Sequence, residues 1–173
     1  MAIVIRRLTS AEWRTYRDLR LRALADSPNA FGSTLAHEST RSDDEWRERV
    51  ERGVNSPRDF PALASVDDLP VGIAWVRFDD DEPGVAHLFQ VWIAPEHRGV
   101  GAGRRLVEAA VAWARSASAD VLRLGVTRDG SAAPYLYRAL GFVDAGEPQP
   151  LRPGSEVESQ PMSLVLSVDA ASF

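Results

Sequence analysis

The chain has 173 residues, 45% of them hydrophobic and 26% charged, which suits one globular domain that can bury a full core. Its formal net charge of −5 disfavours a general nucleic-acid binder, and the absence of cysteine excludes a disulfide framework, a thiol nucleophile and a thiolate metal site. No apolar run approaches the roughly 18 residues of a membrane span, and the N-terminus lacks a signal-peptide pattern. We therefore expect one cytoplasmic domain over residues 1–173, with no membrane, nucleic-acid or metal partner.

The first third of the chain predicts one strand and two helices. Alternating apolar residues predict the strand over 2–8. A capping residue just after it opens a helix that ends near residue 26, one side of which carries Trp13, Tyr16 and either Leu19 or Arg20. Ser42, followed by three acidic residues, predicts the start of a second helix that ends near residue 52.

The remainder of the chain alternates strands and helices. Residues 60–66 and 71–78 have the composition of two strands joined by a hairpin turn, and residues 85–93 predict a third strand, rich in β-branched and aromatic residues. After a glycine-rich loop and its helix we expect a strand over 121–126, a helix over 131–140, a strand from 141 or 142, a loop over 147–154 and a last strand over 158–168. This order indicates a mixed α/β fold.

The loop between residues 93 and 104 carries the most informative pattern. It reads Arg98-Gly99-Val100-Gly101-Ala102-Gly103, and it leads into a helix whose apolar residues recur at helical spacing. A strand that ends where a helix begins presents free backbone N–H groups and the positive end of the helix dipole. Glycines let a phosphate approach the backbone, and the nearby arginines add donors. The loop therefore predicts an anion site.

Two well-known phosphate loops can be compared directly with this one. A P-loop requires lysine, and the chain contains none. A dinucleotide fingerprint that starts at Gly99 and Gly101 requires a third glycine where Arg104 stands. A dinucleotide-binding protein therefore remains only as a weaker alternative.

The loop resembles the coenzyme A pyrophosphate loop of the GNAT N-acetyltransferase superfamily. The segments 93–98 and 137–142, the latter reading Tyr-Arg-Ala-Leu-Gly-Phe, also resemble motifs of that family. The resemblance implies a mixed, mostly antiparallel sheet of six or seven strands, splayed at its centre and flanked by about four helices. It implies transfer of an acetyl group from acetyl-CoA to a primary amine of a small molecule or peptide, by direct attack in a ternary complex. A non-catalytic acyl-CoA-binding module with the same fold is the alternative.

The resemblance also assigns residues to the cofactor. Backbone groups near Val91 and Ile93 would pair with the pantetheine arm, and the Ile93 N–H would face the thioester carbonyl. The family's usual Asn before the second motif is replaced by Gly130, so either Ser131 or Asp129 supplies the missing contact or coenzyme A binds more weakly. The predicted acetyl-CoA-binding residues are Val91, Ile93, Arg98, Gly99, Val100, Gly101, Ala102, Gly103, Arg104, Ser131 and Tyr137.

Catalytic and acceptor-binding roles follow from the same resemblance. Tyr137 matches the tyrosine that protonates the leaving thiolate, with a phenol pKa near 10. His87 is the first candidate for the base, because histidine titrates near neutrality. Glu38 is the alternative base, and Gln90 could orient a water. Phe31 and Glu38 would hold the amine by a cation–π contact and an ion pair.

No metal is expected in this chemistry, and a homodimer would cover the sheet edges.

Overall fold

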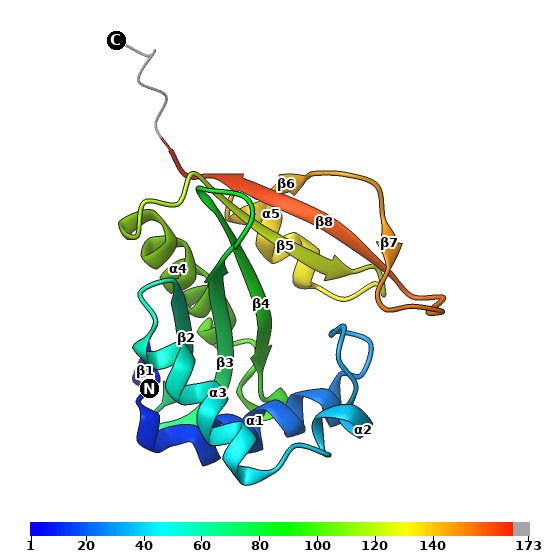
Figure 1. Cartoon of the computed structure of the whole chain (residues 1–173). Helices are drawn as coiled ribbons and strands as arrows, with labels where there is room; N and C mark the ends of the chain where they lie inside the picture. Colours follow the sequence, from blue (N-terminus) through cyan, green and yellow to red (C-terminus); the bar gives the residue numbers. More distant parts are fainter. Residues whose placement is uncertain (168–173) are drawn as a thin grey trace.

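The computed structural model describes residues 1–167, which form one mixed sheet flanked by helices on both faces (Figure 1). Within these residues the strands are β1 (Ile3–Arg7), β2 (Asp59–Val66), β3 (Leu69–Phe78), β4 (Val85–Ile93), β5 (Val121–Thr127), β6 (Val143–Asp144), β7 (Gln149–Pro150) and β8 (Glu158–Val165). The helices are α1 (Trp13–Asp26), α2 (Leu35–Glu38), α3 (Asp43–Asn55), α4 (Ala102–Ser116) and α5 (Ala133–Ala139). The strand order is β1-β2-β3-β4-β5-β8-β6, and β7 pairs with β8.

Two apolar clusters hold these layers together. Helices α1 and α3 pack on one face of the sheet around a buried aromatic cluster, which includes Tyr16, Trp46 and Trp75. Helix α4 covers the other face with its apolar stripe, which includes Leu106, Val107 and Ala110. Each helix is polar on its outer side, so the amphipathic pattern alone decides which side it buries.

Local sequence explains where several elements begin and turn. The side chains of Ser42 and Glu45 form a reciprocal capping box at the start of α3. Asp67 and Asp68 both adopt positive φ, 49° and 67°, which is the conformation of a two-residue turn that matches the twist of the β2–β3 hairpin.

The sheet opens between β4 and β5. These two strands run parallel and pair only at Val85, Ala86 and His87 of β4, opposite the first three residues of β5. Beyond that point β4 stays paired with β3, and β5 stays paired with β8 as far as Thr127. The two halves of the sheet therefore diverge, as Figure 1 shows, and the backbone edge of β4 is left free for another partner.

The predicted fold class is confirmed, including the splayed sheet. The described part of the chain has eight strands in the sheet and five α-helices, rather than six or seven strands and about four helices, because β7 and α2 are too short to give a periodic signal. The strand expected from residue 141 or 142 is present as the two-residue β6. The helix expected over 131–140 begins later, at Ala133, with a proline in its first turn. The last strand, expected to reach residue 168, ends at Val165, and the expected domain's residues 168–173 lie outside the described part.

Candidate active site

Two cavities adjoin where β4 and β5 diverge. The larger has a volume of about 780 Å³ and lies between the end of α1, the exposed edge of β4, the glycine loop and the start of α5. The smaller, of about 90 Å³, lies between β4 and β5 and the loop that follows α1. Val91, Asp129, Ser131 and Tyr137 line both cavities. A molecule that fills the larger cavity therefore meets the smaller one at this shared wall.

The glycine loop forms an anion cradle at one end of the larger cavity. Gly99 and Gly101 have φ values of 79° and 92°, and a Cβ at either position would meet nothing within 4 Å. These glycines are therefore required by backbone conformation rather than by crowding. In α4, the amide of Arg105 donates to the carbonyl of Gly101 at 3.1 Å, while the helix geometry leaves the preceding amides without an intrahelical acceptor. Those amides and the helix dipole favour a phosphate.

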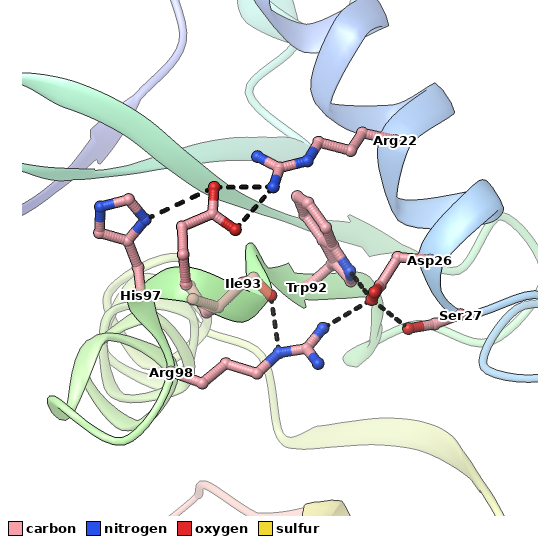
Figure 2. Close-up of polar contacts among 8 residues, drawn as sticks. Arg22, Asp26, Ser27, Trp92, Ile93, His97 and Arg98 are labelled. Carbon is pink, nitrogen blue, oxygen red and sulfur yellow. Dashed lines mark hydrogen bonds and ion pairs between the residues drawn. The ribbon is translucent and has the colours of Figure 1, made fainter.

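Arg98 connects this loop to the strand and to the end of α1 (Figure 2). Its Nε donates to the Ile93 carbonyl at 2.9 Å, and its Nη2 donates to Asp26 at 2.8 Å. Hydrogen bonds from Ser27, Trp92 and Arg98 lower the pKa of Asp26 to about 2, so this carboxylate stays ionised. Arg98 thus fixes the loop in place as well as lining the cavity.

The peptide group of Ile93 faces the free edge of β4. The amide of Ala94 donates to the Val71 carbonyl of β3 at 2.8 Å. Because successive peptide groups of a strand point to opposite edges, the Ile93 amide, one residue earlier, points away from β3. Ile93 lines the larger cavity, so this N–H lies where a ligand carbonyl could accept it.

A bulge in β4 orients the free backbone edge of this strand. Along β4, Phe89 pairs with Trp75 and Trp92 pairs with Ile73, so two residues of β4 stand opposite one residue of β3. Gln90, at the bulge, has a φ of 59°, which is uncommon for a residue with a Cβ. Its side chain accepts a hydrogen bond from the Tyr16 hydroxyl at 2.5 Å, and both side chains are buried.

Tyr137 lies at the shared wall of the two cavities. Its side chain is 7% exposed and its ring packs edge-on against Phe142. Burial raises the pKa of Tyr137 to about 12, so the phenol carries its proton at neutral pH. Such a group can donate a proton to a developing anion beside it.

The structure brings most of the predicted cofactor residues to the larger cavity. Val91, Ile93, Arg98, Gly99, Gly101, Gly103, Arg104, Ser131 and Tyr137 all line it. Val100 and Ala102 are not among its lining residues: the Val100 side chain is exposed, and the Ala102 side chain packs into the core beneath α4. Gly130, which replaces the usual Asn, has a φ of 79° and lies beside Asp129, whose carboxylate accepts from the Ser131 amide at 3.0 Å.

His87 lies away from both cavities. It stands on the paired part of β4, and its Nε2 is 2.8 Å from an oxygen of Asp79 in the β3–β4 turn. Neither cavity is lined by His87. This geometry favours a structural role for the imidazole over the predicted role as the base.

Of the predicted acceptor residues, Phe31 and Gln90 line the smaller cavity, but Glu38 does not. Glu38 is 1% exposed, and its Oε2 already accepts from Arg41 at 2.6 Å and from Arg49 at 3.2 Å. Burial opposes ionisation of Glu38, but these arginines outweigh it and lower its pKa. Glu38 is therefore an ionised partner of arginines and lies outside the lining of the smaller cavity.

Three residues of the site lay outside the sequence-based prediction: Tyr16, Arg20 and Asp26. Each is on α1: Tyr16 bonds Gln90 in β4, Arg20 lies over the Phe31 ring, and Asp26 bonds Arg98 of the glycine loop. Of these three residues, only Arg20 could have been noticed in the sequence, because a charged residue on the apolar side of an amphipathic helix is unusual.

In the described part of the chain, no group of three or more histidine or acidic side chains is arranged to hold a metal ion. None of the helices described there is both long and apolar enough to cross a bilayer.

Comparison with known proteins identifies the family. The model of the acetyltransferase (GNAT) family matches residues 10–142. A mycothiol acetyltransferase from Thermobispora bispora is 32% identical over 129 residues, which cover 72% of this chain and 41% of that protein. The chain thus spans less than half of the length of that relative. Because the family model covers most of the chain, including the glycine loop and α5, the chain belongs to the GNAT acetyltransferase family.

Solved structures agree with this assignment at the level of the fold. The yncA protein from Salmonella typhimurium, solved with acetyl-CoA, has a TM-score of 0.81 at 20% identity and covers 100% of this chain and 99% of its own. Spermidine N-acetyltransferase from Vibrio cholerae, solved with CoA and spermine, has a TM-score of 0.77 at 19% identity and covers 95% of each chain.

Proposed function

We propose that this protein transfers an acetyl group from acetyl-CoA to a primary amine by direct attack in a ternary complex. The observation that carries this proposal is one continuous cavity. Its lining includes the glycine loop before α4 together with Ile93 and Tyr137. The family assignment and a structural neighbour that contains acetyl-CoA support the same conclusion.

The cavity residues divide the chemistry among them. The glycine loop and Arg104 hold the pyrophosphate, and the free edge of β4 pairs with the pantetheine arm. The Ile93 N–H donates to the thioester oxygen, where negative charge develops. The amine nitrogen attacks the carbonyl carbon, the C–S bond breaks, and the thiolate takes the proton of Tyr137. The nitrogen loses one proton to solvent, and the phenol of Tyr137 regains its proton from solvent.

The acceptor amine enters from the smaller cavity, on the opposite side of the shared wall. It must react in its neutral form, because an alkylammonium group has a pKa of roughly 10 and no free lone pair. The base that removes the proton stays a prediction. Comparing His87→Asn with the wild type from about pH 5 to pH 9 tests it, since loss of the essential base would remove the acid limb of the rate profile.

An acceptor screen tests the proposed function. The purified protein is incubated with acetyl-CoA and a panel of primary amines, and released CoA thiol is measured with DTNB. We expect turnover with at least one amine, and calorimetry should show one acetyl-CoA bound per chain. Binding without thiol release across the panel would support a non-catalytic acyl-CoA-binding module instead. Displacement of the ligand by NAD but not by CoA would support the dinucleotide alternative.

We further infer a cytoplasmic location and a homodimer that covers the sheet edge at β1, which pairs with β2 alone in the described residues. Light scattering of the purified protein tests the dimer.

A further inference from the structure

A cleft rich in arginine lies next to the smaller cavity. It has a volume of about 390 Å³, and it is bounded by α3 on one side and by β3 and β4 on the other. Phe89 lines both the cleft and the smaller cavity, so one aromatic side chain separates them. If the amine of an acceptor lies beside Tyr137 in the smaller cavity, the rest of the acceptor can therefore extend toward this cleft.

The cleft is lined by four arginines: Arg41, Arg49, Arg52 and Arg77. Its lining also includes the acidic residues Glu45 and Glu48. Glu45 caps the start of α3, where its Oε2 accepts a hydrogen bond from the Ser42 amide at 2.6 Å. Below the surface, Glu38 lies between Arg41 and Arg49, and Asp59 lies 3.3 Å from Arg77.

Arg20 adds a buried positive charge to this group. It is 2% exposed, and among the described residues its Nε and Nη1 have no hydrogen-bond partner. Its Cζ lies 4.7 Å from the centre of the Phe31 ring, which lines the smaller cavity. Arg20 also lies within the electrostatic reach of Glu38, Arg41 and Arg49. The guanidinium therefore lies near both the cleft and the cavity.

At and beneath the cleft, five arginines lie near four acidic side chains, so positive charge exceeds negative charge by one: the arginines are Arg20, Arg41, Arg49, Arg52 and Arg77, and the acids are Glu38, Glu45, Glu48 and Asp59. Arg20 is the one of these whose Nε and Nη1 have no hydrogen-bond partner among the described residues. Burying a guanidinium without a partner is costly, and a group of that kind is satisfied when a ligand brings the missing acceptor. Arginine is also the side chain whose geometry best matches a carboxylate.

We propose that the acceptor is an amine that carries a carboxylate, bound by Arg20, Arg41 and Arg49 while its amine points toward Tyr137. This inference rests on the proposed acetyltransferase function and names the substrate class of the same site. The amine and carboxylate of one amino acid would then both lie in the smaller cavity, with the carboxylate on the side where Arg20 lies over the Phe31 ring. A polyamine, which carries only positive charge, would be repelled by the same arginines.

Matched acceptors test the carboxylate directly. Methionine, phenylalanine and glutamate are each compared with the corresponding α-amide and with the decarboxylated amine, and spermidine is included as a polycation. We expect kcat/KM for the best amino acid to exceed that for its amide by about 10- to 100-fold, as for a lost charge-assisted hydrogen bond. Spermidine should be the poorest acceptor.

Variants then test the arginines. Arg20→Gln and Arg49→Gln should reduce the preference for the carboxylate over the amide by about tenfold, while the KM for acetyl-CoA stays unchanged. Arg20→Lys, which keeps the charge, should restore part of the preference. Arg47→Gln is the matched control, since Arg47 lies on the same helix α3, is paired with Asp44 at 2.7 Å and does not line the cleft. Thermal unfolding of each variant shows whether it is folded.

Binding measurements separate this inference from the proposed function. Calorimetry of the CoA complex with N-acetylmethionine and with N-acetylmethioninamide needs no turnover. Tighter binding of the carboxylate that is lost in Arg20→Gln supports the inference even if no amine is acetylated. If amides or spermidine are acetylated as well as amino acids, or if the two N-acetyl compounds bind equally, the inference is wrong while the acetyltransferase function stands.

Discussion

At the scale of single residues, the proposed acetyl transfer requires a protonated phenol at Tyr137. Burial raises its pKa to about 12, so it can act as an acid and not as a base near neutral pH. We predict that Tyr137→Phe lowers kcat by about 100-fold, since a general acid contributes on that order. The KM for acetyl-CoA should change little, because the ring and its packing remain.

The DTNB assay at saturating acetyl-CoA measures this effect. Tyr135→Phe serves as the control, because Tyr135 is 73% exposed and lies two residues away on the same helix. Retention of full kcat in Tyr137→Phe would show that the thiolate leaves without this proton.

Arg104 and Arg105 form a natural pair for testing the phosphate contact. They are adjacent in α4, but only Arg104 lines the larger cavity. We predict that Arg104→Gln raises the KM for acetyl-CoA about tenfold by loss of a charge-assisted contact, and that Arg105→Gln leaves it near the wild-type value. Equal effects of the two substitutions would indicate a general field of positive charge instead of a specific contact.

At the scale of elements, the start of α4 depends on backbone conformation. Gly101 has a φ of 92° and open space around it, so Gly101→Ala costs backbone strain of about 1 to 2 kcal/mol without a clash. We predict that this substitution also raises the KM for acetyl-CoA, because relief of the strain turns the amides away from the phosphates.

Gly154→Ala is the control for this prediction. Gly154 has a φ of 78° and equally open space, but its loop does not line the larger cavity. Urea unfolding should show a similar loss of stability in both variants, and steady-state kinetics should show a raised KM only in Gly101→Ala. A raised KM in both variants would assign the effect to reduced stability.

The bulge in β4 is the second element with a specific requirement. Tyr16 on α1 holds the side chain of Gln90, whose backbone is in the left-handed region. We predict that Tyr16→Phe costs about 1 to 3 kcal/mol, because it leaves the buried Gln90 oxygen without its donor. It should also lower kcat, since the free edge of β4 is less firmly oriented.

Urea unfolding and the DTNB assay together check the prediction for Tyr16. A stability loss without any change in kcat would mean that the bulge keeps its geometry without this hydrogen bond.

At the scale of the whole molecule, buried tyrosines should limit stability at alkaline pH. Burial raises the pKa of Tyr16 as well as that of Tyr137, whose folded-state value is about 12. The unfolded chain loses these protons near pH 10, before the folded protein does, so unfolding becomes easier as the pH rises above that value.

We predict that the stabilisation from Tyr137, on the order of 2 kcal/mol, is complete below about pH 10 and is lost as the pH rises through about 12. Urea unfolding of the wild type and Tyr137→Phe at increasing pH measures it. The variant should lose less stability over this range. Parallel curves for the two proteins would contradict the buried state of this phenol.

Much of this architecture is encoded locally and could be predicted from the sequence. The strand over 85–93, the capping box of α3 and the glycine loop depend on periodicity, caps and backbone freedom, which neighbouring residues determine. Tyr137 and most of the loop residues that the family motifs indicated line one cavity. The short elements α2 and β7 were missed because one turn or one pair of residues leaves no periodic pattern.

The polar partners that shape the site were decided only by the tertiary structure. Tyr16 and Gln90 are 74 positions apart, and Asp26 and Arg98 are 72 positions apart. Likewise, the sequence did not reveal that Glu38 would be hydrogen-bonded to Arg41 and Arg49, because those contacts form only in the folded chain. Sequence patterns report which side of an element is buried, but a hydrogen bond between two elements depends on how they pack. The amide cradle was therefore determined by local sequence, whereas the partners of the buried charges were determined by the fold.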